Sequence, residues 1–168
     1  MQYKFKTEPY EHQLEALKRS WNKKEYAYFM EMGTGKSKVL IDNIAVLYDK
    51  GGINAAVIVA PKGVYRNWSE KEIPTHMPEH VLRQVAVWSP APTKQQKKVL
   101  TDLFLPSDDL KILVVNVEAF STKKGVTFVE KFILTHNCLI AVDESTTIKN
   151  PKAQRTKNLL KLAINTKY

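Results

Sequence analysis

Short apolar runs alternate with segments of helical periodicity along this chain of 168 residues. The apolar runs predict five strands, at residues 26–30, 55–60, 84–88, 110–116 and 138–142. Helical spacing of apolar residues between them predicts helices at residues 9–22, 36–50, 64–73, 93–104, 126–136 and 151–163. Strands this short and apolar are typical of a mainly parallel sheet with helices on both faces. In such α/β folds, ligands bind just beyond the carboxyl ends of the strands.

Capping residues and prolines mark the expected ends of three helices. Thr93 is a suitable N-cap for the helix at residues 93–104. Asn150 is a suitable N-cap for the last helix, with Pro151 at its first position. Pro74 is expected to end the helix at residues 64–73.

The charge balance favours a polyanionic partner. Lysine and arginine together number 26 against 17 aspartates and glutamates, which gives a net charge of +9. A basic domain of this size is typical of proteins that bind nucleic acid and, less often, anionic membranes. A merely basic surface explains the composition equally well, so the charge alone does not decide between these interpretations.

Composition also excludes several classes of protein. The longest unbroken apolar run, residues 55–60, is far shorter than the roughly 18 residues of a membrane span. The first ten residues lack the apolar stretch of a secretory signal, so we expect none. A single cysteine excludes an internal disulfide framework and a cysteine-rich zinc site. These features fit a reducing, intracellular compartment.

A glycine-rich turn follows the first predicted strand. Residues 31–37 read Glu-Met-Gly-Thr-Gly-Lys-Ser, and the candidate nucleotide loop comprises Met32, Gly33, Thr34, Gly35, Lys36 and Ser37. Its glycines would let backbone N–H groups curl around phosphate at the start of the following helix. Lys36 would reach the β- and γ-phosphates, and the Ser37 hydroxyl would bind Mg²⁺. Met30 stands where the full P-loop pattern has its first glycine, and an ordinary glycine turn is the alternative.

Two adjacent carboxylates follow the last predicted strand. The apolar run at residues 138–142 would deliver Asp143 and Glu144 to the carboxyl edge of the sheet. Asp143 would hold Mg²⁺, and Glu144 would orient and deprotonate an attacking water. An isolated pair of this kind is more often an N-cap, but its combination with a P-loop favours nucleotide hydrolysis.

The segment from about residue 7 to residue 157 resembles the first RecA-like lobe of superfamily-two helicases, especially the Swi/Snf-type DNA translocases. The matching segments, in order, are PYEHQ at 9–13 for the Q-motif, 31–37 for motif I, VAPK at 59–62 with Asn67-Trp68 for motif Ia, VVNVE at 114–118 for motif Ib, Asp143–Thr146 for motif II, and IKNP at 148–151 for the Swi/Snf-type extension. Motif II departs from the family's pattern, with Ser-Thr in place of Ala-His.

The resemblance implies roles for further residues. Gln13 would recognise the edge of the adenine of ATP. The same nucleotide site would also bind Mg²⁺. Pro61, Lys62, Arg66, Asn67 and Asn116 would lie along the track for one DNA strand, positioned by contacts to phosphate rather than to bases. Trp68 would either pack within the helix after motif Ia or stack on a base, and packing is favoured.

The family's next strand, which leads into motif III, would begin just past Tyr168, and a second lobe carrying an arginine finger would follow. That strand would lie between the P-loop strand and the strand before Asp143. Without it we expect strand swapping with a neighbouring copy, closure of the gap, or a partly loose sheet edge.

Residues 1–168 are therefore interpreted as one N-terminal RecA-like ATP-binding lobe, truncated before the motif III strand. The expected function is that of an ATP-dependent helicase or translocase acting on duplex or branched DNA, with weak nucleotide binding and slow hydrolysis by the lobe alone. We expect it in the cytoplasm of a bacterium or a phage-infected cell, associated with the nucleoid. A non-catalytic nucleic-acid-binding or regulatory fragment is the alternative, and a small-molecule P-loop kinase has less support.

Overall fold

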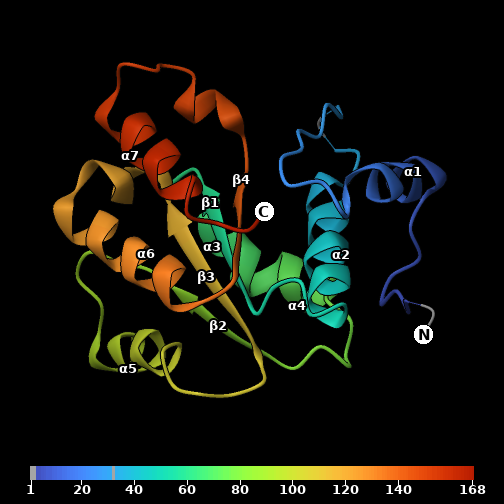
Figure 1. The fold of residues 1–168 in the computed structure, drawn as a ribbon, viewed down its shortest axis with the longest axis horizontal. Helices are drawn as coiled ribbons and strands as arrows, with labels where there is room; N and C mark the ends of the chain where they lie inside the picture. The colour runs from blue at the N-terminus through green and yellow to red at the C-terminus, as the bar shows by residue number, and fades with distance from the viewer. Residues whose placement is uncertain (1–2, 32) are drawn as a thin grey trace.

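A four-stranded, wholly parallel sheet lies at the centre of the computed structural model, which describes residues 3–31 and 33–168 (Figure 1). Its strands are β1 (Ala55–Ala60), β2 (Arg83–Val87), β3 (Leu110–Asn116) and β4 (Cys138–Val142), arranged in the order β2-β3-β1-β4. Three of the predicted strands are confirmed with the predicted bounds, and the strand predicted at 84–88 is displaced by one residue.

Helices cover both faces of this sheet, so the predicted three-layer α/β architecture is confirmed (Figure 1). On one face lie α2 (Lys36–Asp49), α3 (Tyr65–Asn67), the π-helical turn η1 (Trp68–Glu72) and α4 (Ile73–His76). The other face carries α5 (Lys94–Asp102), the 3₁₀ turn η2 (Val117–Ser121), α6 (Lys123–Thr135) and α7 (Gln154–Ala163). Helix α1 (Glu11–Ser20) packs against the outside of α2.

The two apolar cores follow from the alternation of side chains along each strand. All six residues of β1 are buried, and Val57 and Val59 point into the core beneath α5, α6 and α7. Ala56 and Ile58 point into the other core, beneath α2 and α4. A central strand buried on both faces needs apolar residues at every position, which explains the unbroken run in the sequence.

The strand predicted at residues 26–30 is wrong, because these residues pair with no strand that the structure describes. Tyr26 and Phe29 are 45% and 97% exposed. The outer edge of β4 instead meets the last two residues, since Lys167 N donates to Cys138 O and Ile140 N donates to Tyr168 O. An isolated segment cannot hold the extended ladder without a partner strand beside it, so its apolar composition alone does not make it a strand.

Two helix ends also differ from the predictions. Helix α7 begins at Gln154 rather than at Pro151, because the side chain of Asn150 accepts from Lys152 N in a local turn. The helical segment that was expected to stop before Pro74 continues to His76. Pro74 lies at the start of α4, directly after the wider π-helical turn, and this helical segment accommodates it without ending.

The remaining caps agree with the chemistry of their residues. The Thr93 side chain accepts from Gln96 N, as predicted for the start of α5. Thr122 caps α6 by accepting from Gly125 N, which places the start of that helix before residue 126. Of the helices in residues 3–31 and 33–168, none is long and apolar enough to cross a membrane.

Candidate functional site

The strand register brings three of the predicted site segments to one edge of the sheet. Ala60 at the end of β1 lies beside Asn116 at the end of β3, and Val59 lies beside Val142 at the end of β4. Asp143 continues this ladder, because its N–H donates to Val59 O over 2.7 Å. Pro61, Asn116 and Asp143 therefore follow three neighbouring parallel strands at the same carboxyl edge.

The glycine-rich loop has the backbone that its sequence predicted. Gly33 and Gly35 have φ angles of 78° and 80°, in the left-handed region that favours glycine. Thr34 Oγ1 donates to Glu31 O over 2.7 Å, which closes the turn. Met32 belongs to the predicted nucleotide loop but lies outside the described residues.

Lys36 and Ser37 open α2 at the end of this loop. The Lys36 ammonium donates to Met30 O at 2.9 Å and to Glu31 O at 3.2 Å, so it folds back over the loop. Two of its three N–H donors are thereby engaged. The helix ladder begins with the bond from Val39 N to Gly35 O, so the N–H groups of the preceding residues point out of the helix end. That end suits an anion.

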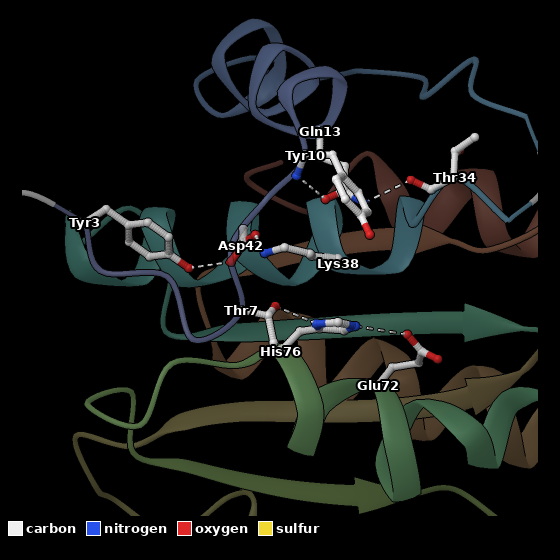
Figure 2. A network of polar contacts seen from close by, with 9 residues as sticks. All are labelled: Tyr3, Thr7, Tyr10, Gln13, Thr34, Lys38, Asp42, Glu72 and His76. Atoms are coloured by element: carbon white, nitrogen blue, oxygen red, sulfur yellow. Dashed lines mark hydrogen bonds and ion pairs between the residues drawn. The ribbon is translucent and has the colours of Figure 1, made fainter.

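Gln13 ties α1 to the glycine-rich loop (Figure 2). Its Oε1 accepts from Tyr10 N over 3.0 Å, and its Nε2 donates to Thr34 O over 3.0 Å. The side chain is only 5% exposed. These two bonds fix the orientation of the amide beside the loop, and its contact to adenine stays a prediction.

A buried ion pair lies within α2 and anchors the N-terminal segment to it. Lys38 Nζ and Asp42 Oδ2 are 2.7 Å apart on α2, both nearly inaccessible to solvent, and Tyr3 Oη donates to Asp42 Oδ1 over 2.8 Å (Figure 2). Burial raises the pKa of Asp42, and the hydrogen bonds from Lys38 and Tyr3 oppose that rise. These contacts hold the N-terminal segment across α2.

The same N-terminal segment reaches α4 through Thr7, whose hydroxyl lies 2.8 Å from His76 Nδ1. Burial lowers the pKa of His76, and the charge of Glu72 opposes that shift. Sequence reasoning missed this network of Tyr3, Lys38, Asp42 and His76. The spacing of Lys38 and Asp42, four residues apart on the largely buried helix α2, is the signal that could have identified its centre.

The pair after β4 is arranged asymmetrically. Asp143 Oδ2 accepts a hydrogen bond from Trp68 Nε1 at 3.0 Å. Glu144 is exposed and has a φ of 57°, the one non-glycine residue in the described part of the chain with a positive φ. Left-handed backbone at a glutamate is strained, and such strain is concentrated at functional sites. Among the described residues, no hydrogen bond or ion pair joins Lys36 to Asp143.

The residues predicted to contact nucleic acid divide into two groups. Lys62, Arg66 and Asn67 are exposed between β1 and η1, and Asn67 Nδ2 donates to Glu72 Oε1 over 3.1 Å. Asn116 is buried, and its Oδ1 accepts from Ala119 N over 3.0 Å as the cap of η2. All of these contacts to nucleic acid stay predictions. Trp68 is 2% exposed, so its predicted packing is confirmed over base stacking.

The donor set fits a magnesium nucleotide. The hydroxyl of Ser37 and the carboxylate of Asp143 are hard oxygen ligands, which Mg²⁺ prefers. A Cβ placed on Gly33 would meet no heavy atom within 4 Å, so the loop borders open space. Phosphate could therefore bind at the start of α2, with a metal between α2 and β4. Glu144 could orient a water molecule at that position.

Comparison with known proteins identifies a family and a similar fold. The model of the SNF2-related domain family matches residues 12–168. Among solved structures, the fold is similar to the Sulfolobus solfataricus SWI2/SNF2 ATPase core in complex with dsDNA, with a TM-score of 0.66 and 18% sequence identity. The match covers 94% of this chain and 30% of the other, so the chain spans about a third of the length of that protein. No curated protein matches.

Proposed function

Because the chain belongs to the SNF2-related domain family, we propose that it is the ATP-binding motor lobe of an ATP-dependent DNA helicase or translocase. The observation that carries this proposal is the pairing of two features. A loop with left-handed Gly33 and Gly35 opens α2, and Asp143 and Glu144 directly follow β4. Phosphate binding and water activation need these two elements side by side.

Each residue of the site has a distinct task in this proposal. The N–H groups at the start of α2 and the Lys36 ammonium bind the phosphates of ATP, and Ser37 and Asp143 hold Mg²⁺. The metal, when bound, neutralises charge on the phosphates. Glu144 orients the attacking water and accepts its proton. Gln13 keeps its bond to Thr34 and offers its second Nε2 proton to adenine.

The nucleic-acid track lies along the carboxyl edge of β1 and β3. Lys62 and Arg66 supply positive charge, while the half-buried Pro61 directly follows β1 and the exposed Asn67 ends α3. Asn116 is engaged in capping η2, so its contact would come through its amide Nδ2 or its backbone. Contacts of this type bind phosphates and carry no base sequence, which suits a motor that moves along DNA. The net charge of +9 supports the same partner.

The 168 residues alone should bind nucleotide weakly and hydrolyse it slowly. Lys36 must exchange its bonds to the carbonyl oxygens of Met30 and Glu31 for phosphate. Fast phosphoryl transfer in motors of this kind needs a second lobe, which contributes an arginine and closes over the phosphates. The same bonds of Lys36 to the loop carbonyls favour a second candidate function, that of a non-catalytic nucleic-acid-binding or regulatory fragment.

Titration with a fluorescent ATP analogue and Mg²⁺, with and without duplex DNA, tests this function. We expect Lys36→Ala to abolish nucleotide binding and Lys97→Ala, an exposed control on α5, to leave it unchanged. Lys62→Ala and Arg66→Ala should weaken DNA binding and lower its dependence on salt by about one phosphate contact each. Their nucleotide binding should be retained.

Failure of nucleotide binding in the wild-type chain, with DNA binding intact, would replace the motor lobe by the binding module. If neither Lys62→Ala nor Arg66→Ala weakens DNA binding, the proposed nucleic-acid track is contradicted. Robust DNA-stimulated hydrolysis by the 168 residues would contradict the need for a second lobe.

Self-association by strand exchange is also proposed. Beyond Ile140 the outer edge of β4 has no partner strand among the described residues. Phe29, an apolar residue of the segment before the glycine-rich loop, is almost fully exposed. Mass measurements over a range of concentrations should show a dimer that forms as concentration rises, whereas a monomer throughout would contradict it.

A further inference from the structure

Trp68 packs in an apolar core and also makes one polar contact. The residue begins η1 and lies in the same apolar cluster as Tyr65, Ile73 and Met77. Only 2% of it is exposed, yet its indole N–H reaches Asp143 Oδ2 at 3.0 Å, across 75 positions of sequence. A buried indole donor needs an acceptor, and here that acceptor is the carboxylate at the end of β4.

We propose that Trp68 is a positioning residue that orients the Asp143 carboxylate for the metal. This inference rests on the proposed function, in which Asp143 holds Mg²⁺. The indole occupies Oδ2, so Oδ1 is the oxygen directed to the metal or to a water of its shell. Outer partners that orient a ligand in this way contribute strongly to metal affinity.

The surroundings of Trp68 make it suitable for this role. The Trp68 side chain has two rotatable bonds, and the apolar cluster beneath α2 and α4 restricts both. Packing therefore sets the direction of the indole N–H. Asp143 is fixed in turn by the bond from its own N–H to Val59 O. The hydrogen bond therefore joins two rigid elements, η1 and the end of β4, and a flexible donor such as lysine would not fix one carboxylate rotamer.

The first test follows the indole N–H signals of the three tryptophans by ¹H–¹⁵N NMR during a titration with MgCl₂ alone. Signals are assigned with Trp68→Phe and Trp88→Phe. We expect the Trp68 signal to shift and saturate while the Trp88 signal, from the core on the other face, stays in place. Asp143→Asn should abolish the shift. This measurement uses the wild-type side chain at position 68, so it does not depend on how well a variant folds.

The second test measures the Mg²⁺ concentration that gives half-maximal binding of the fluorescent ATP analogue. Trp68→Phe keeps most of the apolar contacts and removes the donor, and it should raise this concentration about tenfold or more. Trp88→Phe should leave it unchanged. Nucleotide binding in EDTA should be the same in all three proteins, which a general loss of structure would not allow. In an Asp143→Asn background, Trp68→Phe should add no further loss.

A Trp68 signal that ignores Mg²⁺, or a wild-type Mg²⁺ requirement in folded Trp68→Phe, would overturn the positioning role. The proposed function fails separately if the wild-type chain binds no nucleotide while the Trp68 indole still responds to Mg²⁺ through Asp143. If neither the Trp68 signal nor nucleotide binding responds to Mg²⁺, the positioning role and the proposed function are both overturned.

Discussion

Gln13 Nε2 donates to the carbonyl oxygen of Thr34 over 3.0 Å, and this bond links the first helix to the glycine-rich loop (Figure 2). The other end of the same amide accepts from Tyr10 N and stabilises the start of α1. One buried side chain thus bonds to two backbone groups, one beside it at Tyr10 and one at Thr34, 21 residues after Gln13. The loop conformation and the position of α1 are therefore coupled.

Gln13→Ala should lower the free energy of unfolding by about 1–3 kcal/mol, because it leaves Tyr10 N without its partner and leaves Thr34 O with only its contact to His12 Nε2. Urea denaturation measures the change. Gln95→Ala, at an exposed position of α5, should stay within about 0.5 kcal/mol of the wild type. Equal effects in the two variants would show that the link to the loop contributes little.

Gly35→Ala should destabilise the protein more than Gly33→Ala. Both residues have positive φ, so each alanine costs about 1–2 kcal/mol. A Cβ at Gly35 would also lie 2.2 Å from Gln13 Nε2, whereas one at Gly33 would meet nothing within 4 Å. In a Gln13→Ala background the excess cost at Gly35 should disappear. A double-mutant cycle from denaturation curves measures this coupling, and additive effects would contradict it.

Asn116→Ala should destabilise the protein by about 1 kcal/mol, because it removes the cap that accepts from Ala119 N at the start of η2. Asn116→Ser retains a capping oxygen and should recover most of the loss. Thermal unfolding distinguishes the two variants. If both are as stable as the wild type, then the principal role of Asn116 is not structural.

The stability of the protein should depend on pH through His76. Burial lowers its pKa from the ordinary 6.5, so the unfolded chain binds more protons than the folded chain between the lowered value and 6.5. Stability should therefore rise with pH through that window and be fully present above it. Urea denaturation of wild type and His76→Gln from pH 5 to 8 should show a steeper rise in the wild type.

His80→Gln is the matched control, since His80 is exposed and lies 2.9 Å from Asp49. It should preserve the steeper rise of the wild type. An NMR titration in which His76 has a pKa above 6.5 would reverse the expected sign.

Much of the fold was predictable because its signals are local. The unbroken apolar run of β1 and the helical spacing of α2 depend only on neighbouring residues. The glycine-rich turn was predictable for a similar reason, since left-handed backbone at Gly33 and Gly35 is a property of glycine. The carboxylates of Asp143 and Glu144 could be placed at the sheet edge because they follow an apolar strand directly.

The segment at residues 26–30 marks the limit of such reasoning. Its composition is that of a buried strand, yet Phe29 is 97% exposed and the segment stays outside the sheet. A strand forms only where a neighbouring strand accepts its hydrogen bonds, and the position beside β4 is taken by Lys167 and Tyr168. Pairing between distant segments is not written in either segment alone.

By itself, the sequence determined the four strands of the sheet, the longer helices between them, the glycine loop and the acidic pair, because each is encoded within a few consecutive residues. Tertiary structure alone decided that Trp68 donates to Asp143, that Gln13 reaches Thr34, and that Tyr3 meets Asp42. Each of these bonds joins residues between 21 and 75 positions apart. They form where packing of the two cores brings a buried donor within reach of an acceptor, and an unpaired polar group would otherwise cost free energy.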